Sequence, residues 1–218
     1  MQADELHWPA AGEHARGTID GPAGALETAI AMPKTSARGL VLVAHPHPQQ
    51  GGTLDNKVTY MTARAMVESG FAAIRVNYRG VGQSEGGYDA GQGEFDDLRV
   101  ARQWALQQSG LPDAGVAGFS FGAWLALCLA VSDGARALLT IGLPVEYFEN
   151  NLPRADTAWR ALFGDADDVI DVDRAIHAVQ ALQPPVDTQI MSGAGHFLHG
   201  RLGELRRLAG DHFDAHGD

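Results

Sequence analysis

The sequence predicts an α/β fold in which a mainly parallel sheet is covered by helices on both faces. Short apolar segments bounded by Gly or Pro alternate along the chain with longer segments of helical periodicity. This repeated order of strand and helix is typical of parallel strands joined by right-handed crossovers. A Gly-Pro-Ala-Gly turn at residues 21–24 interrupts the first apolar stretch, 18–32, and predicts an antiparallel hairpin at the edge of the sheet.

The remaining elements follow the hairpin in chain order. Strands are expected at residues 39–44, 71–77, 115–119, 135–142, 157–163 and 186–191. Helices are expected at residues 55–69, 94–108, 121–131, 171–182 and 200–208. Apolar residues predominate in most of the strand segments, which indicates burial on both faces. The irregular stretch 143–156 has the length of a loop with one helical turn and is too short for a cap domain.

Length and charge limit the possible functions. A chain of 218 residues fits one domain spanning residues 1–218, since single α/β domains commonly have about 200–250 residues. The 27 acidic and 16 basic side chains give a formal net charge of −11 without any Lys/Arg cluster. We therefore expect no binding to nucleic acid or to anionic lipid.

The cellular setting is also indicated by the sequence. Its longest apolar run, residues 123–131, is much shorter than the ~20 residues that cross a bilayer. Residues 1–17 lack the basic start and apolar centre of a signal peptide. Cys128 is the only cysteine, which excludes an internal disulfide and a cysteine-based metal site. These features predict a cytoplasmic protein that does not span a membrane.

A Gly-Phe-Ser-Phe-Gly segment at residues 118–122 is the strongest functional motif. It lies between the predicted strand 115–119 and the predicted helix 121–131, the context in which a Gly-x-Ser-x-Gly turn presents a nucleophile. The glycines permit a tight turn that lifts the Ser120 hydroxyl clear of the sheet. The N–H of Phe121, at the helix start, is then free to bind an oxyanion. The alternative is a glycine-rich turn whose serine only caps the helix.

A serine nucleophile needs a base, and that base needs an acid to orient it. His196 follows the last predicted strand through a flexible Ser-Gly-Ala-Gly segment, and we predict that it is the base, with His199 as the alternative. The segment after strand 157–163 supplies three carboxylates, among which composition does not choose. They are Asp165, Asp167 and Asp168. Such aspartates also form turns and cap helices.

Further segments accompany the serine motif. They are His-Pro-His-Pro at 45–48 with Gly-Gly-Thr at 51–53, Asn-Tyr-Arg-Gly-Val-Gly-Gln-Ser-Glu-Gly at 77–86, and Gly-His-Phe-Leu-His-Gly at 195–200. Together they resemble the α/β-hydrolase superfamily, and specifically its small lidless bacterial serine hydrolases related to dienelactone-hydrolase-like esterases. The resemblance covers nearly the whole chain. It implies the α/β-hydrolase fold without a cap domain, and it places the acid at the fourth position of a Gly-x-x-Asp block, which is Asp167.

The resemblance also places a second oxyanion donor in the turn after strand 39–44. Both prolines of this turn lack an N–H group, so the predicted donor is the N–H of His47, with Gln49 or the glycines 51–52 as alternatives. His45 and His47 could instead form a His-x-His metal pair, but no further ligands follow at suitable spacing. We therefore expect neither a metal nor another cofactor.

These residues predict a serine hydrolase that cleaves carboxylic esters of short or medium acyl chain through an acyl-enzyme on Ser120. Its partner would be a small-molecule ester or acyl substrate. Candidates for an apolar acyl pocket are Phe119, Phe121, Tyr147, Phe148, Phe197 and Leu198. A peptidase or a thioesterase could use the same Ser-Asp-His triad. A noncatalytic binding protein could also retain the motif.

Overall fold

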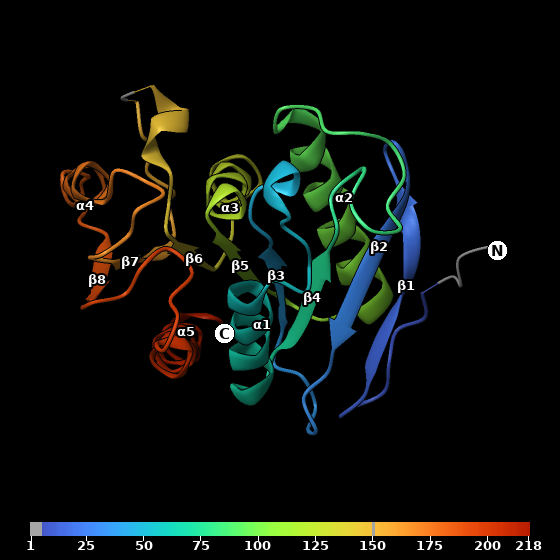
Figure 1. The fold of residues 1–218 in the computed structure, drawn as a ribbon. Coiled ribbons are helices and arrows are strands. Elements are labelled where there is room, and N and C mark those ends of the chain that lie inside the picture. Colours follow the sequence, from blue (N-terminus) through green and yellow to red (C-terminus); the bar gives the residue numbers. More distant parts are fainter. Residues whose placement is uncertain (1–5, 150) are drawn as a thin grey trace.

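One sheet of eight strands runs through the described part of the molecule, in the order β1-β2-β4-β3-β5-β6-β7-β8 (Figure 1). The structure is a computed structural model that describes residues 6–149 and 151–218. Residues 1–5 of the predicted domain and residue 150 of the predicted loop 143–156 lie outside the described residues.

Each predicted strand and helix is present in the structure. The strands are β1 (His14–Gly21), β2 (Gly24–Ala31), β3 (Leu40–Ala44), β4 (Ala72–Val76), β5 (Asp113–Phe119), β6 (Ala137–Ile141), β7 (Ala158–Gly164) and β8 (Asp187–Met191). The helices are α1 (Lys57–Glu68), α2 (Gln92–Ser109), α3 (Phe121–Asp133), α4 (Val172–Gln180) and α5 (Leu202–His216). Short 3₁₀ helices cover Pro48–Gln50 and Val145–Phe148.

The sheet is antiparallel only at its N-terminal edge. The predicted hairpin forms between β1 and β2, and β2 also pairs antiparallel with β4. From β4 onward each strand is parallel to its neighbours, through β3, β5, β6, β7 and β8. The segments that follow these parallel strands therefore meet at one edge of the sheet, where functional residues are expected.

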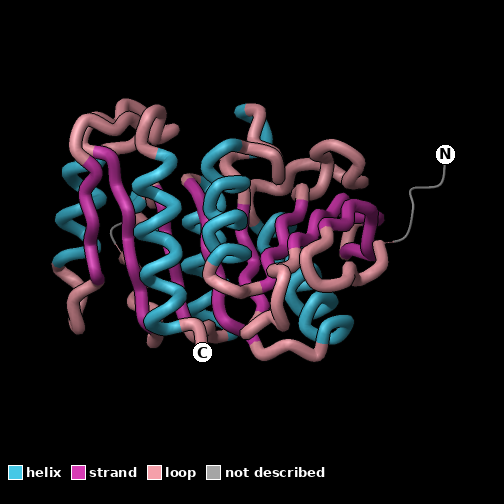
Figure 2. The backbone as a smooth tube through the Cα atoms, turned by 90° about the horizontal axis from the view of Figure 1, so that it is seen from below, coloured by secondary structure: helices cyan, strands magenta, loops and turns pink. Residues whose placement is uncertain are grey.

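Helices cover both faces of the sheet (Figure 2). Helices α1 and α5 lie side by side on one face, where Met66 and Phe213 join one apolar core. Helices α2, α3 and α4 cover the other face, where Leu98 and Leu127 join the second core. Burial of apolar surface on both faces is the main stabilising contribution to such a fold. Among the described residues, no helix combines the length and apolar character that a membrane-spanning segment requires.

Two predicted elements need correction. The strand predicted at 186–191 is not buried on both faces, because β8 lies at the edge of the sheet, and Met191 alone among its residues is buried. The helix predicted at 200–208 continues to His216. The helical spacing of apolar residues is interrupted by Gly210 and the polar residues around it, so the sequence pattern ends too early. In the structure His212 and Phe213 are nevertheless buried against the sheet.

The extension of α5 predicts a large effect of Phe213→Ala on stability. Phe213 has no exposed surface, and its ring lies 6.1 Å from that of Phe71. Removing a buried phenyl ring leaves a cavity, so the free energy of unfolding in urea should fall by about 3–5 kcal/mol. The control is Asp211→Ala on the exposed side of the same turn, which should cost less than about 0.5 kcal/mol. Equal small effects of both variants would contradict the packing of this helix end.

Candidate active site

The turn from β5 into α3 holds Ser120 in a strained backbone conformation. Its φ of 54° and ψ of −121° lie outside the regions that residues with a side chain ordinarily adopt. Its N–H donates to the carbonyl of Ile141 on the neighbouring strand, at 2.8 Å. The hydroxyl of Ser120 makes no capping hydrogen bond to α3. The alternative of a capping serine is therefore wrong, and the hydroxyl is not used to stabilise the helix.

The two glycines of the motif are required by close contacts of the backbone. A Cβ atom on Gly118 would collide with the carbonyl oxygen of Gly122. A Cβ atom on Gly122 would lie 2.5 Å from the carbonyl oxygens of both Ala44 and His45. The spacing of the motif thus reflects a turn packed tightly against the end of β3.

His196 and Asp167 form a buried pair. The ring Nδ1 of His196 lies 2.7 Å from Oδ2 of Asp167, and the two side chains are only 3% and 1% exposed. The other carboxylate oxygen of Asp167 accepts the N–H groups of Val169 and Ile170. Burial alone would raise the pKa of the Asp167 carboxyl, but these hydrogen bonds, that from His196 foremost, hold it below its usual value.

The ring of His196 lies beside the Ser120 turn. It packs against Phe119, with ring centroids 4.9 Å apart. A Cβ atom on Gly142, next to the carbonyl that accepts the Ser120 N–H, would lie 3.2 Å from the His196 ring. No hydrogen bond joins Ser120 and His196 among the described residues. Such bonds are often long in hydrolases without a bound substrate, and within the described chain the Nε2 atom of His196 has no hydrogen-bond partner.

The remaining acid and base candidates are placed differently. Asp165 accepts the N–H of Gly193 at 2.6 Å and so ties the loop after β7 to the loop after β8. Asp168 is exposed. His199 is also exposed, and its ring lies 6.1 Å from that of Phe197. Of the three carboxylates predicted after β7, the structure brings Asp167 to His196.

Two backbone N–H groups near Ser120 have no acceptor among the described residues. They belong to Phe121, the first residue of α3, and to His47. Their rings lie 4.9 Å apart, so both residues flank the same turn. The alternative donors are engaged, since the N–H of Gln49 donates to the His47 ring and that of Gly52 to the His47 carbonyl.

His45 has a structural role. It is fully buried, its Nδ1 lies 2.7 Å from the Pro46 carbonyl oxygen, and its Nε2 accepts the N–H of Tyr78. Burial lowers the pKa of His45 to about 3, so the ring is neutral at neutral pH. Because both ring nitrogens are used, His45 cannot pair with His47 on a metal. Among the described residues no group of His, Cys, Asp and Glu side chains could hold a metal ion.

The predicted apolar pocket residues differ in exposure. Phe119, Phe121 and Leu198 are almost completely buried and belong to the core. Phe148 is partly buried and packs against the core. Tyr147 and Phe197 are 42% and 46% exposed and are free to contact a ligand.

Sequence reasoning missed Tyr88 and Glu94. Tyr88, 37% exposed, lies in the loop between β4 and α2 and packs against His47, with ring centroids 5.3 Å apart. Glu94 is fully buried, and its carboxylate accepts the N–H groups of Asp89 and Gly91. The Gly-x-x-Glu spacing at residues 91–94, typical of a capped helix start, could have revealed Glu94.

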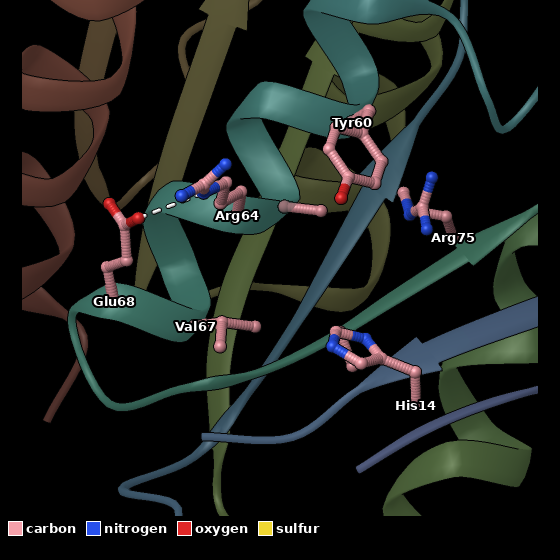
Figure 3. A pocket seen from close by; sticks show the side chains of 8 residues that line it. His14, Tyr60, Arg64, Val67, Glu68 and Arg75 are labelled. Atoms are coloured by element: carbon pink, nitrogen blue, oxygen red, sulfur yellow. Dashed lines mark hydrogen bonds and ion pairs between the residues drawn. The ribbon is translucent and has the colours of Figure 1, made fainter. Parts of the chain in front are cut away.

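A separate cavity of about 300 Å³ lies between α1 and the strands β1, β2 and β4 (Figure 3). Tyr60, Arg64 and Arg75 line it together with His14, and Arg64 is paired there with Glu68. None of the predicted site residues lines this cavity. The candidate active site is therefore the region around Ser120.

Comparisons with known proteins agree with the fold. The model of the family described as X-Pro dipeptidyl-peptidase (S15 family) matches residues 20–195. An uncharacterized protein of Rickettsia prowazekii is 33% identical over an alignment of 211 residues that covers 89% of this chain and 86% of that protein. An α/β serine hydrolase homologue from Coxiella burnetii is 37% identical, with a TM-score of 0.87 over 94% of this chain and 98% of its own. A serine hydrolase without a lid from Xanthomonas campestris is 32% identical, with a TM-score of 0.85 over 94% of this chain and 95% of its own.

The burial of His45 predicts how stability depends on pH. Below pH 6.5 the unfolded chain binds a proton at this residue, whereas the folded chain does so only near pH 3, so the wild type loses stability as the pH falls. At pH 7.5 the His45→Gln variant should have a lower free energy of unfolding than the wild type. At pH 5.0 this difference should be smaller by about 2 kcal/mol, because the variant lacks the group that takes up the proton on unfolding. Urea unfolding at both pH values measures the difference.

The control for this experiment is His199→Gln. His199 is exposed, so its replacement should change the free energy of unfolding by less than about 0.5 kcal/mol at either pH. A deficit of His45→Gln that is the same at pH 7.5 and pH 5.0 would show that His45 is not held neutral by burial.

Proposed function

This chain belongs to the X-Pro dipeptidyl-peptidase (S15) family of α/β serine hydrolases, and we propose that it cleaves carboxylic esters through an acyl-enzyme on Ser120. The observation that carries the proposal is the arrangement around this serine. In the part of the chain that the structure describes, its hydroxyl makes no capping hydrogen bond, the His196–Asp167 pair lies beside its turn, and two N–H groups without acceptors flank that turn.

In this proposal His196 is the general base. Asp167 is ionised at neutral pH, accepts a hydrogen bond from the Nδ1–H group of His196 and so fixes the ring in one tautomer. The lone pair of Nε2 is then available to take the Ser120 proton as Oγ attacks the acyl carbonyl carbon. The same proton is afterwards given to the leaving alcohol, and water releases the acyl group by the reverse sequence.

The oxyanion would be stabilised by backbone groups. The N–H groups of Phe121 and His47 would donate to the carbonyl oxygen as it becomes negative, and the positive end of the α3 dipole points toward the same place. Loss of one such donor in comparable hydrolases lowers turnover by about 10²–10³-fold. This chemistry requires no metal and no cofactor.

The substrate range follows from what surrounds the site. Between β6 and β7 the described chain forms only a short helix, Val145–Phe148, and no cap domain. A site without a cap favours short or medium acyl chains and tolerates bulky leaving groups, whereas a long lipid chain would be left in water. We therefore favour small esters over insoluble lipids as substrates.

The name of the matching family favours a peptidase as the second candidate function. The same triad can act on an amide or a thioester, because Ser120 and His196 contact only the reacting carbonyl and the leaving atom. Three substrates separate the three activities: 4-nitrophenyl butyrate for an esterase, butyryl-CoA for a thioesterase and alanyl-prolyl-4-nitroanilide for a peptidase. We expect the ester to have the highest kcat/KM of the three substrates in one preparation. If the amide has the highest kcat/KM, the chain is a peptidase.

Ser120→Ala should remove activity without unfolding the protein. Without the Oγ atom no acyl-enzyme forms, so kcat for 4-nitrophenyl butyrate should fall by roughly 10⁴-fold or more and labelling by a fluorophosphonate should be lost. Ser132→Ala, an exposed serine near the other end of α3, should retain full labelling and activity. A folded wild-type protein that reacts with no fluorophosphonate would instead indicate a noncatalytic binding protein.

The identity of the acid can be tested with three matched variants. Asp167→Asn removes the acceptor that fixes the His196 tautomer, so kcat should fall by roughly 10³–10⁴-fold. Asp168→Asn changes an exposed side chain and should leave kcat within about twofold. Asp165→Asn loosens the contact with Gly193, for which we expect an intermediate loss. The largest loss in Asp165→Asn or Asp168→Asn would show that Asp167 is not the acid.

A further inference from the structure

Exposed aromatic rings surround one side of the Ser120 turn. The buried ring of Phe121 forms their base, with centroids 4.9 Å from His47, 6.3 Å from Tyr88 and 6.2 Å from Tyr147. Tyr88 and Tyr147 remain 37% and 42% exposed. They come from two segments far apart in the sequence, after β4 and after β6, and Figure 1 shows both segments at the top of the molecule. Ligand sites commonly use such exposed rings.

The two tyrosines are held in fixed positions. Tyr147 stacks on Trp124 with centroids 4.5 Å apart and an interplanar angle of 13°. Trp124 in turn packs against Gly91, where a Cβ atom would collide with the indole ring. Gly91 lies in the Tyr88 loop, which the buried Glu94 carboxylate holds through two backbone N–H groups at 2.8 Å each. Rings that are already fixed lose little conformational freedom when a ligand binds.

These rings pack against Phe121, whereas His196 packs against Phe119, the residue on the other side of Ser120 in the sequence. Phe119 packs against His196 and belongs to the core under α1 and α5, whereas Phe121 belongs to the core under α2, α3 and α4. Ser120 lies between them in sequence. Because His196 must give its proton to the leaving alcohol, that alcohol lies on the His196 side, where Phe197 is exposed. The acyl group then extends toward Tyr88 and Tyr147.

We propose that Tyr88 and Tyr147 form a binding site for an aromatic acyl group, so that the preferred substrates are esters of aryl-substituted carboxylic acids. This inference rests on the proposed function. The Tyr88 hydroxyl lies 3.3 Å from Nε2 of His47, and the rings of Tyr88 and Tyr147 both pack against the ring of Phe121. A flat aromatic ring can contact these ring faces more closely than a saturated ring can.

The test compares 4-nitrophenyl phenylacetate with 4-nitrophenyl cyclohexylacetate, which share the leaving group and the carbon skeleton but differ in aromaticity. The wild type should favour the phenylacetate about tenfold in kcat/KM, since each favourable ring contact contributes about threefold or more. Tyr88→Leu and Tyr147→Leu should each lower this preference about threefold, through KM for the phenylacetate. Tyr147→Phe retains the ring and should retain the preference.

Tyr60→Leu is the matched control. Tyr60 is also an exposed tyrosine, but it lies on α1 and lines the separate cavity of Figure 3, so its replacement should leave the preference unchanged. The rate of fluorophosphonate labelling tests Ser120 independently. Two results would overturn the aromatic site alone. One is normal labelling of the wild type with equal kcat/KM for both esters, and the other is an unchanged preference in both tyrosine-to-leucine variants. Absence of labelling and of ester hydrolysis in the wild type would overturn the proposed function as well.

Discussion

The strained backbone of Ser120 is the constraint on which the rest of the site depends. A residue with a side chain in this conformation costs about 1–3 kcal/mol, and it persists only where the surrounding structure enforces it. Here the centre of the sheet holds Ser120 in this conformation. Strand β5 lies between β3 and β6, and the Ser120 N–H donates a hydrogen bond to the carbonyl of Ile141. The Ser120 hydroxyl makes no capping hydrogen bond to α3, so it is not committed to stabilising the helix.

The parallel sheet brings the other groups to the same edge. Asp167 follows β7 and His196 follows β8, and the two loops form one unit because the N–H of Ala166 donates to the carbonyl of Ala194 at 3.0 Å. The contact between Asp165 and Gly193 adds a second link. The pair is therefore positioned by contacts between neighbouring loops. This rigidity is what a preorganised general base requires.

The sequence predicts those features that depend on local pattern. Apolar runs bounded by glycine predict the strands, and the glycine spacing around Ser120 predicts the turn. Both patterns depend only on residues that are close together in the sequence. The choice of Asp167 among three aspartates was not available from composition, since it depends on which carboxylate meets His196 across two loops. The end of α5 was missed because Gly210 is a poor helix former that packing against the sheet overrides. The contact between Gly91 and Trp124, which links the loops of Tyr88 and Tyr147, joins distant segments and leaves no local signal.

The most direct test of the central claim is a crystal structure of the protein after reaction with a small fluorophosphonate. The account predicts a bond from phosphorus to Oγ of Ser120, with the phosphoryl oxygen about 2.7–3.1 Å from the backbone nitrogens of His47 and Phe121. His196 should lie within hydrogen-bond distance of Oγ, with Asp167 still on its Nδ1 atom. An adduct on another residue, or a phosphoryl oxygen turned away from both nitrogens, would contradict it.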